Sequence, residues 1–259
     1  MLNSNLSQSL NANLIQQYLN ALVCDFVIEL HVLITVDSTN QFLKQLVAST
    51  YPVMCCAEEQ TAGRGRLNNT WHSPFGENIY LSICYNSVKL DPCLSLVIAI
   101  AIVQALQQLG ISNCLQIKWP NDILWQQKKL AGILLENFHN NLIIGIGLNV
   151  NIEPLESNWC SLYNITQIKY DRNLLIAYLL QSIDHALKQF QNYGLDYFMP
   201  IWQALDALYG QHITLIQQHT KNVLSGVAMG ISPIGQLLLV DEQGITHKLF
   251  SSETIKVRN

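Results

Sequence analysis

Charged side chains are scarce in this chain of 259 residues, where they make up 12% of the sequence against 49% for apolar residues. A composition this apolar is typical of a globular protein and excludes an intrinsically disordered one. The formal net charge is −4, so no general affinity for nucleic acid is predicted. The length suits one large domain with a small additional module.

Long hydrophobic runs and export signals are also missing. The longest apolar run covers residues 94–106, which is too short to span a bilayer and predicts a buried helix. The polar first 13 residues have neither the basic nor the apolar region of a secretory signal, so we expect no membrane partner and a cytoplasmic location. The seven cysteines are odd in number and lack metal-type spacing, which favours reduced thiols.

Several motifs of known chemistry are absent as well. The chain contains no GxxxxGK[ST], no GxSxG and no HExxH. The segment "GIGLNV" at 145–150 lacks the third glycine of a dinucleotide-binding fingerprint and continues as a strand. Any catalytic or ligand-binding site must therefore use residues outside these motifs.

Hydrophobic periodicity predicts alternating helices and strands up to about residue 209. Ser38 and Gln41 have the spacing of a capping box at the start of one helix. Gly110 is a plausible C-cap for another. Helices are predicted over 14–22, from 38, over 94–109, from 172 and over about 195–208; strands over 26–36, 52–60, 78–85, from 115 to Pro120, and on both sides of a hairpin near His139, Asn140 and Asn141.

The character of the sequence changes after Gly210. Short strands are predicted near 211–217, 223–231, 235–240, 245–250 and 254–257, separated by polar turns. Five short strands in about fifty residues indicate a small β-barrel. We therefore place a boundary near residue 209.

Arginine is rare, since the chain has only four, and two of them lie in "QTAGRGR" at 60–66. Gly63 and Gly65 allow backbone amides to approach a ligand, and Arg64 and Arg66 offer bidentate recognition of a carboxylate or phosphate. No acidic residue between 60 and 76 neutralises them. They are either solvated loop charges or an anion site, and Lys129 is a further basic group.

Other polar residues also have two interpretations. Ser38 and Thr39 fit a helix N-terminus, which can also bind a polar head group. Asn121 and Asp122 suit a turn, and Asp122 could instead help to hold a metal-bound triphosphate.

Two glycines and two tryptophans are equally open to interpretation. Gly145 and Gly147 indicate either close strand packing or a bare floor beneath a ligand. Trp119 and Trp159 are core or surface aromatics, or walls of a pocket.

Six blocks between about Val36 and Asn151 occur in one order: "VDSTN", "EEQTAGRGR", "W.SPFGENIYLS", "KWPND", "KLAGILLE" and "IGIGLNVN". Together they resemble the bacterial biotin protein ligases, also called biotin–[acetyl-CoA-carboxylase] ligases. The resemblance implies an α+β fold. Residues 1–209 would form a catalytic domain of the class II tRNA-synthetase-like, biotin/lipoate ligase type, with a mixed sheet flanked by helices. Residues 210–259 would form a small SH3-like β-barrel.

The resemblance also implies a reaction in two steps. The carboxylate of biotin attacks the α-phosphorus of ATP, which gives biotinyl-5′-AMP and pyrophosphate, and a lysine of a biotin carboxyl carrier domain then takes the biotin. Two unit charges about 4 Å apart repel by roughly 4 kcal/mol at an effective dielectric near 20. Arginine, lysine and Mg²⁺ would offset this repulsion.

The family resemblance places roles on particular residues of this chain. Lys129, Arg64 and Arg66 are expected to be catalytic. Biotin is expected to contact Ser38, Thr39, Asn40, Gln60, Gly63, Arg64, Gly65, Arg66, Lys129, Gly132, Gly145 and Gly147. ATP or the adenylate is expected to contact Arg64, Arg66, Trp71, Asn121, Lys129, Asn149 and Arg258, with Asp122 as a metal ligand.

The chain departs from the best-known bifunctional members in two places. Only 37 residues precede Ser38, too few for a winged helix-turn-helix, so DNA binding is not expected. "LNNT" follows Arg66, where the family often has further basic residues. A carrier domain is the expected partner, and a homodimer is compatible with the sequence. The alternatives are a lipoate ligase on the same fold, a biotin-responsive regulator and a biotin-binding module without catalysis.

Overall fold

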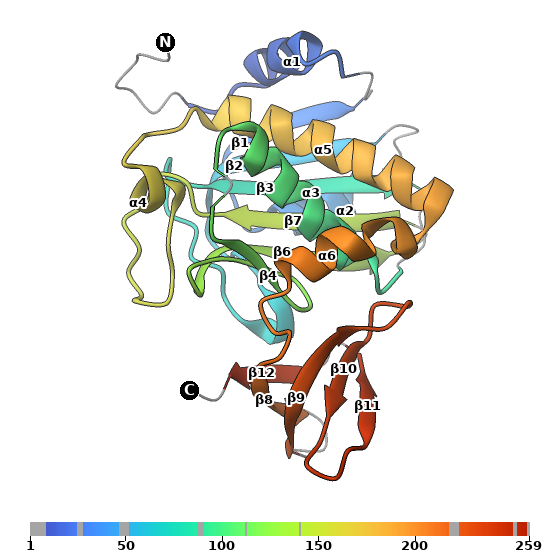
Figure 1. Ribbon diagram of the computed structural model, residues 1–259. Coiled ribbons are helices and arrows are strands. Elements are labelled where there is room, and N and C mark those ends of the chain that lie inside the picture. The colour runs from blue at the N-terminus through green and yellow to red at the C-terminus, as the bar shows by residue number, and fades with distance from the viewer. Residues whose placement is uncertain are drawn as a thin grey trace.

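The chain folds around two β-sheets, as a computed structural model shows (Figure 1). The structure describes residues 9–24, 28–46, 52–86, 91–111, 113–139, 141–217, 223–250 and 253–257. The α-helices are α1 (Ala12–Ala21), α2 (Thr39–Gln45), α3 (Leu94–Gln108), α4 (Leu162–Thr166), α5 (Arg172–Tyr193) and α6 (Met199–Leu205), and the 3₁₀ helices are η1 (Arg66–Asn68) and η2 (Leu195–Phe198).

The large sheet has seven strands in the order β1-β2-β3-β7-β6-β5-β4. Its strands are β1 (Glu29–Val36), β2 (Val53–Gln60), β3 (Ile79–Asn86), β4 (Leu115–Lys118), β5 (Asp122–Trp125), β6 (Lys128–Phe138) and β7 (Asn141–Leu148). The pair β1–β2 is parallel and the other neighbours are antiparallel, so the sheet is mixed as expected. The predicted hairpin joins β6 to β7, with Phe138 opposite Asn141.

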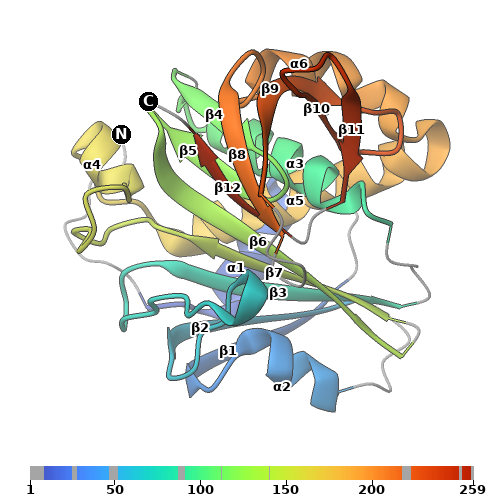
Figure 2. The ribbon, with the colours of Figure 1, turned by 90° about the horizontal axis from the view of Figure 1, so that it is seen from below.

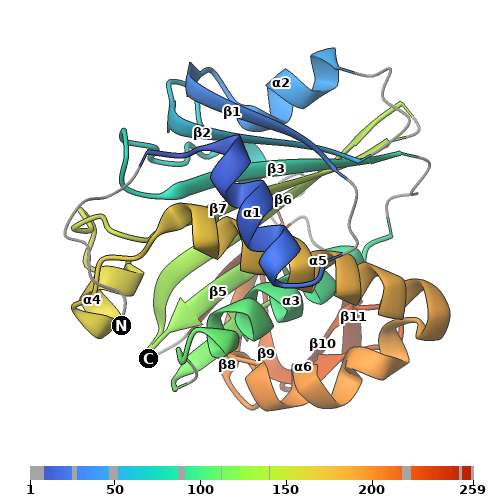
Figure 3. The same ribbon diagram turned by 90° about the horizontal axis from the view of Figure 1, so that it is seen from above.

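Helices cover both faces of this sheet. Figures 2 and 3 show α1, α3, α5 and α6 on one side and α2 on the other. The apolar run at 94–106 forms most of α3, which is buried nearly all round against the sheet and α5. Gly110 follows α3 with φ +82°, as the C-cap prediction requires. No helix in the described ranges is long and apolar enough to cross a membrane.

Two helix predictions need correction. The capping box of Ser38 and Gln41 does not form, because among the described contacts the Ser38 side chain caps no backbone amide of α2. The amide of Thr39 instead donates to Gln60 Oε1 at 3.0 Å, so a side chain from β2 satisfies the helix start. The helix predicted over 195–208 is divided into η2 and α6.

A second, antiparallel sheet follows and has five strands in the order β11-β10-β9-β8-β12. Its strands are β8 (His212–Gln217), β9 (Val223–Ile231), β10 (Leu237–Val240), β11 (Thr246–Leu249) and β12 (Glu253–Val257), each close to its predicted position. Figure 1 shows this sheet below the β4 edge of the large sheet. Trp119 Nε1 donates to Gly235 O at 3.0 Å and thereby joins the two parts.

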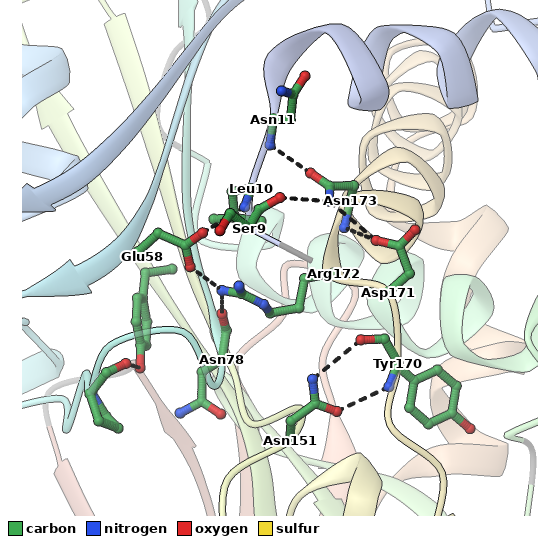
Figure 4. A network of polar contacts seen from close by, with 12 residues as sticks. Ser9, Leu10, Asn11, Glu58, Asn78, Asn151, Tyr170, Asp171, Arg172 and Asn173 are labelled. Atoms are coloured by element: carbon green, nitrogen blue, oxygen red, sulfur yellow. Dashed lines mark hydrogen bonds and ion pairs between the residues drawn. The ribbon is translucent and has the colours of Figure 1, made fainter. Parts of the chain in front are cut away.

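A buried ion pair holds the start of α5 to the large sheet (Figure 4). Arg172 Nη1 lies 2.6 Å from Glu58 Oε2, with both side chains at most 5% exposed. Glu58 also accepts the amide of Leu10, and Arg172 donates to Asn78 O at 3.3 Å. Charges this deeply buried require such partners, since each would otherwise lose its hydration.

Candidate functional site

One cavity on the α2 face of the large sheet collects most of the residues selected from the sequence. Its walls come from α2, the end of β2, the segment after β2, and strands β6 and β7. It is lined by Ser38, Thr39, Asn40, Gln60, Arg64, Gly65, Arg66, Trp71, Asn121, Lys129, Gly132, Ile133, Leu134, Gly145, Ile146 and Gly147. On β6 and β7, Gly132 and Leu134 share one face, as do Gly145 and Gly147, because alternate residues of a strand point to the same side of the sheet.

Glycines form the floor of the cavity. Gly132 on β6 and Gly147 on β7 are register partners, so two positions without side chains lie next to each other. The indole of Trp71 covers them: a Cβ at Gly147 would overlap the ring, and a Cβ at Gly132 would lie 3.0 Å from Cζ3. The free volume is only about 50 Å³. The Trp71 indole occupies the space directly above the two glycines, so a ligand that lies on this floor requires the ring to move.

A chain of hydrogen bonds forms the polar end of the cavity. Thr39 donates through both its amide and its hydroxyl to Gln60 Oε1, at 3.0 and 3.1 Å. Gln60 Nε2 then donates to Ser73 Oγ at 3.0 Å. On the other side, Ser82 Oγ lies 2.7 Å from Thr39 Oγ1 and 2.5 Å from Asn40 Oδ1. These contacts fix the orientations of the side-chain amides of Asn40 and Gln60.

Cationic groups occupy the opposite end. Lys129 Nζ lies 2.8 Å from Asp122 Oδ1 and 5.3 Å from the centre of the Trp71 ring, which gives it an ionic and a cation–π partner. Arg66 Nη1 donates to Asn121 Oδ1 at 3.0 Å. Burial lowers the pKa of the Arg66 guanidinium, while the Asp122 carboxylate acts in the other direction.

The second arginine of the motif has a different partner. Arg64 Nη2 lies 3.2 Å from Glu136 Oε1 on β6, and Lys44 Nζ contacts the same oxygen at 3.0 Å. Asn40 Nδ2 donates to Glu136 Oε2 at 2.8 Å. Desolvation raises the pKa of Glu136, but hydrogen bonds from Asn40 and Lys44 and the charges of Lys44 and Arg64 outweigh it, so the net pKa is lowered.

The glycine-arginine segment is a compact hairpin in this structure. The amide of Trp71 donates to Gly63 O at 2.9 Å, and the amide of Gly65 donates to Asn69 O at 2.7 Å. Its tip has left-handed backbone at Leu67 (φ 59°) and Asn68 (φ 61°), a conformation that asparagine tolerates better than leucine. The "LNNT" sequence therefore forms the tight turn that orients both arginines.

The remaining predicted residues lie beside the cavity. Gly63 is packed so tightly that a Cβ would overlap Trp71 O. Asp122 contacts Lys129, and Asn149 Nδ2 donates to Cys160 O at 3.0 Å, so both are positioned to support neighbouring residues.

Trp159 forms an isolated bridge with Lys129, and Trp119 is buried. Arg258 lies outside the described residues.

Sequence reasoning missed several residues at the site. Ser82 and Glu136 end the blocks "W.SPFGENIYLS" and "KLAGILLE", but neither was given a role, because each follows an apolar run without a distinctive spacing. Ile133, Leu134 and Ile146 line the cavity between the selected glycines. Their strand positions next to those glycines were the one available signal.

Comparison with known proteins agrees with this geometry. The model of the Biotin/lipoate A/B protein ligase family matches residues 32–152. The Escherichia coli bifunctional ligase/repressor BirA is 36% identical over 229 residues, which cover 83% of this chain and 70% of that protein. The Paracoccus denitrificans biotin–[acetyl-CoA-carboxylase] ligase is 30% identical, with 78% of this chain and 90% of that protein covered.

A solved structure agrees over nearly its whole length. The biotin protein ligase from Aquifex aeolicus in complex with biotin and ATP superposes with a TM-score of 0.81 at 29% identity, covering 89% of this chain and 99% of that one. These likenesses confirm the resemblance found in the six sequence blocks. The chain therefore belongs to the biotin protein ligases, within the biotin/lipoate protein ligase family.

Proposed function

We propose that this protein activates biotin with ATP and transfers it to a lysine of a biotin carboxyl carrier domain. The observation that carries the proposal is the two-ended cavity. A hydrogen-bonding wall around Thr39, Asn40 and Gln60 suits the ureido ring of biotin, and the cations Arg66 and Lys129 suit its carboxylate and the phosphates of ATP.

In the first step a carboxylate oxygen of biotin forms a bond to the α-phosphorus of ATP, and the bond from that phosphorus to pyrophosphate breaks. Lys129 and Arg66 stabilise the negative charge that develops on the phosphoryl oxygens. Both groups are held by partners, Asp122 and Asn121, so little reorganisation is needed during the reaction.

In the second step the neutral amine of the carrier lysine attacks the carbonyl carbon of the adenylate, the C–O bond to AMP breaks, and the nitrogen releases one proton to the solvent as the amide forms. The protein supplies no nucleophile. The hairpin 63–71 covers the cavity, and Trp71 lies over its floor. Together they would exclude water, which otherwise hydrolyses the mixed anhydride.

Mg²⁺ is proposed as a companion of ATP. Within the described ranges no cluster of three or more His, Cys, Asp or Glu side chains forms a protein cage for a metal. Among the described residues the buried Oδ1 of Asp122 has no hydrogen-bond donor assigned to it, and the ammonium of Lys129 lies 2.8 Å away as its ionic partner. One carboxylate together with substrate phosphates is a usual environment for Mg²⁺, so the residues fit this ion. The ion would neutralise phosphate charge during adenylation.

The test is an exchange of radiolabelled pyrophosphate into ATP, with biotin and lipoate in parallel, followed by labelling of a carrier domain. We expect exchange and labelling with biotin. Exchange with lipoate in place of biotin would reverse the choice between the two ligase types, and no exchange with either would refute the function.

Other features of the protein stay predictions. Residues 1–209 and 210–259 are proposed as separate domains, supported by the second sheet beginning at His212. The free thiols of Cys55, Cys56, Cys84, Cys93 and Cys160 suit a reducing compartment such as the cytoplasm. A homodimer can be tested by analytical ultracentrifugation.

A further inference from the structure

Glu136 connects three segments that surround the cavity. It lies on β6 and binds Asn40 and Lys44 of α2 together with Arg64 of the hairpin, over distances of 2.8, 3.0 and 3.2 Å. Its side chain is 17% exposed, so these contacts are partly shielded from water. A carboxylate with two cationic partners and one amide donor is a strong charge-assisted cluster.

Glu136 does not line the cavity in the described part of the chain, whereas Asn40 and Arg64 do. It therefore lies behind the residues that face the ligand. Asn40 is held from three sides: Glu136 accepts from Nδ2, Ser82 lies 2.5 Å from Oδ1, and Gly145 leaves the space that the amide occupies. Among these, Glu136 is the one charged contact.

The Arg64 guanidinium depends on the same carboxylate. Its side chain is 39% exposed, so solvent competes for it. Arg66, two residues later, binds Asn121 instead. The two arginines therefore have different partners. Glu136 holds Arg64 near Asn40, whereas Asn121 holds Arg66 at the cationic end of the cavity.

We propose that Glu136 is a positioning residue for biotin: it holds Arg64 and the Asn40 amide in the arrangement that binds biotin. This inference rests on the proposed function. Because Glu136 lies behind the residues that face the ligand and acts only through them, we expect it to affect binding in the ground state and in the transition state alike. Loss of such uniform binding raises KM and leaves kcat nearly unchanged.

The first variant is Glu136→Gln, which keeps an acceptor for Asn40 and removes the charge that holds Arg64. We expect the KM for biotin in pyrophosphate exchange to rise about tenfold, with kcat within about twofold of wild type. The matched control is Lys44→Met, which removes another partner of Glu136 without changing a cavity residue. Its KM should stay within about twofold of wild type.

A second variant and a double variant complete the test. Glu136→Asp keeps the charge on a shorter side chain and should give a smaller rise in KM. In an Arg64→Ala background, Glu136→Gln should add less than about twofold, because the two residues act as one unit. Circular dichroism melting curves monitor the fold of each variant.

The outcomes separate the two proposals. If the wild type shows no biotin-dependent exchange, the proposed function fails. If the wild type is active, a biotin KM within twofold of wild type in Glu136→Gln overturns the positioning role, as does an equal rise in Lys44→Met. Independent, multiplicative effects of Arg64→Ala and Glu136→Gln would also overturn it.

Discussion

The ammonium of Lys129 lies 2.8 Å from the Oδ1 atom of Asp122. Asp122 begins β5 and is the register partner of Gly132, so the carboxylate sits at the edge of the glycine floor. The residue expected to contact a metal is thus also the partner of the residue expected to be most important for catalysis. Substitutions of Lys129 and Asp122 distinguish the role of Asp122 as a metal ligand from its role as the partner of Lys129.

Lys129→Ala should lower kcat for biotin-dependent pyrophosphate exchange by about 10²- to 10³-fold, since it removes a fixed cation from the developing phosphoryl charge. The neighbouring Lys128 is exposed, and Lys128→Ala is a matched control that should retain near-normal exchange. Thermal melting should show both variants folded. Normal adenylation by Lys129→Ala would show that its assigned role is wrong.

Asp122→Asn should also lower kcat, because the ammonium of Lys129 loses the carboxylate that orients it. The measurement is exchange activity across a titration of Mg²⁺. If Asp122 only positions Lys129, extra Mg²⁺ restores little activity. Recovery to wild-type kcat at high Mg²⁺ would instead identify Asp122 as a metal ligand.

The glycine floor predicts a graded steric effect. A Cβ at Gly147 would overlap the Trp71 ring, whereas one at Gly132 would approach it to 3.0 Å. Gly147→Ala should therefore weaken biotin binding by about 10- to 100-fold, and Gly132→Ala by less. Isothermal titration calorimetry with biotin measures both. Equal affinities in the two variants would contradict this account of the floor.

The contact between Arg66 and Asn121 predicts a coupled effect on the intermediate. Arg66→Ala should accelerate loss of the adenylate into water, because a half-buried cation no longer holds the anion. Asn121→Ala should have a weaker effect in the same direction. The double variant should differ from additivity by about 1 kcal/mol. Rapid-quench measurement of adenylate release gives all three rates, and strict additivity would argue against coupling.

The buried pair of Arg172 and Glu58 predicts a large effect on stability away from the cavity. Arg172→Met leaves the Glu58 carboxylate buried without its cation, at a cost of about 3–5 kcal/mol. Lys188→Ala breaks an i,i+4 ion pair with Asp184 in which the lysine side chain is 58% exposed, and it serves as the control, with a change below about 1 kcal/mol. Urea unfolding measures both. Similar midpoints for the two variants would show that the buried pair contributes little.

Local patterns predicted most strands and helices, because apolar periodicity and turn residues are properties of short segments. The order of the large sheet could not be predicted in this way. Gly147 pairs with Tyr80 on one side and Gly132 on the other, which are contacts between distant parts of the chain. The capping-box prediction failed because the start of α2 also depends on a distant part of the chain. Oε1 of Gln60, on β2, accepts the hydrogen bond from the amide of Thr39.

Most cavity residues could be selected because the family resemblance named them, and not because their chemistry was unambiguous. Arg64 and Arg66 looked equivalent in the sequence, but the structure gives them different partners. Glu136 ends the block "KLAGILLE" but was not selected, because a single carboxylate in a half-buried strand has no distinctive spacing. Its importance depends on Asn40 and Arg64, which approach it only in the folded chain.

The segment "KWPND" contacts different parts of the protein through successive residues. Lys118 Nζ lies 3.5 Å from Ile255 O on β12, and Trp119 donates to Gly235 O in the turn between β9 and β10. Asn121 and Asp122 bind Arg66 and Lys129 at the cavity. Cutting the chain near residue 209 would leave a buried indole N–H without its acceptor only two residues away from the cationic end of the cavity. We therefore expect an isolated fragment of residues 1–209 to be less stable than the full chain and less active in adenylation.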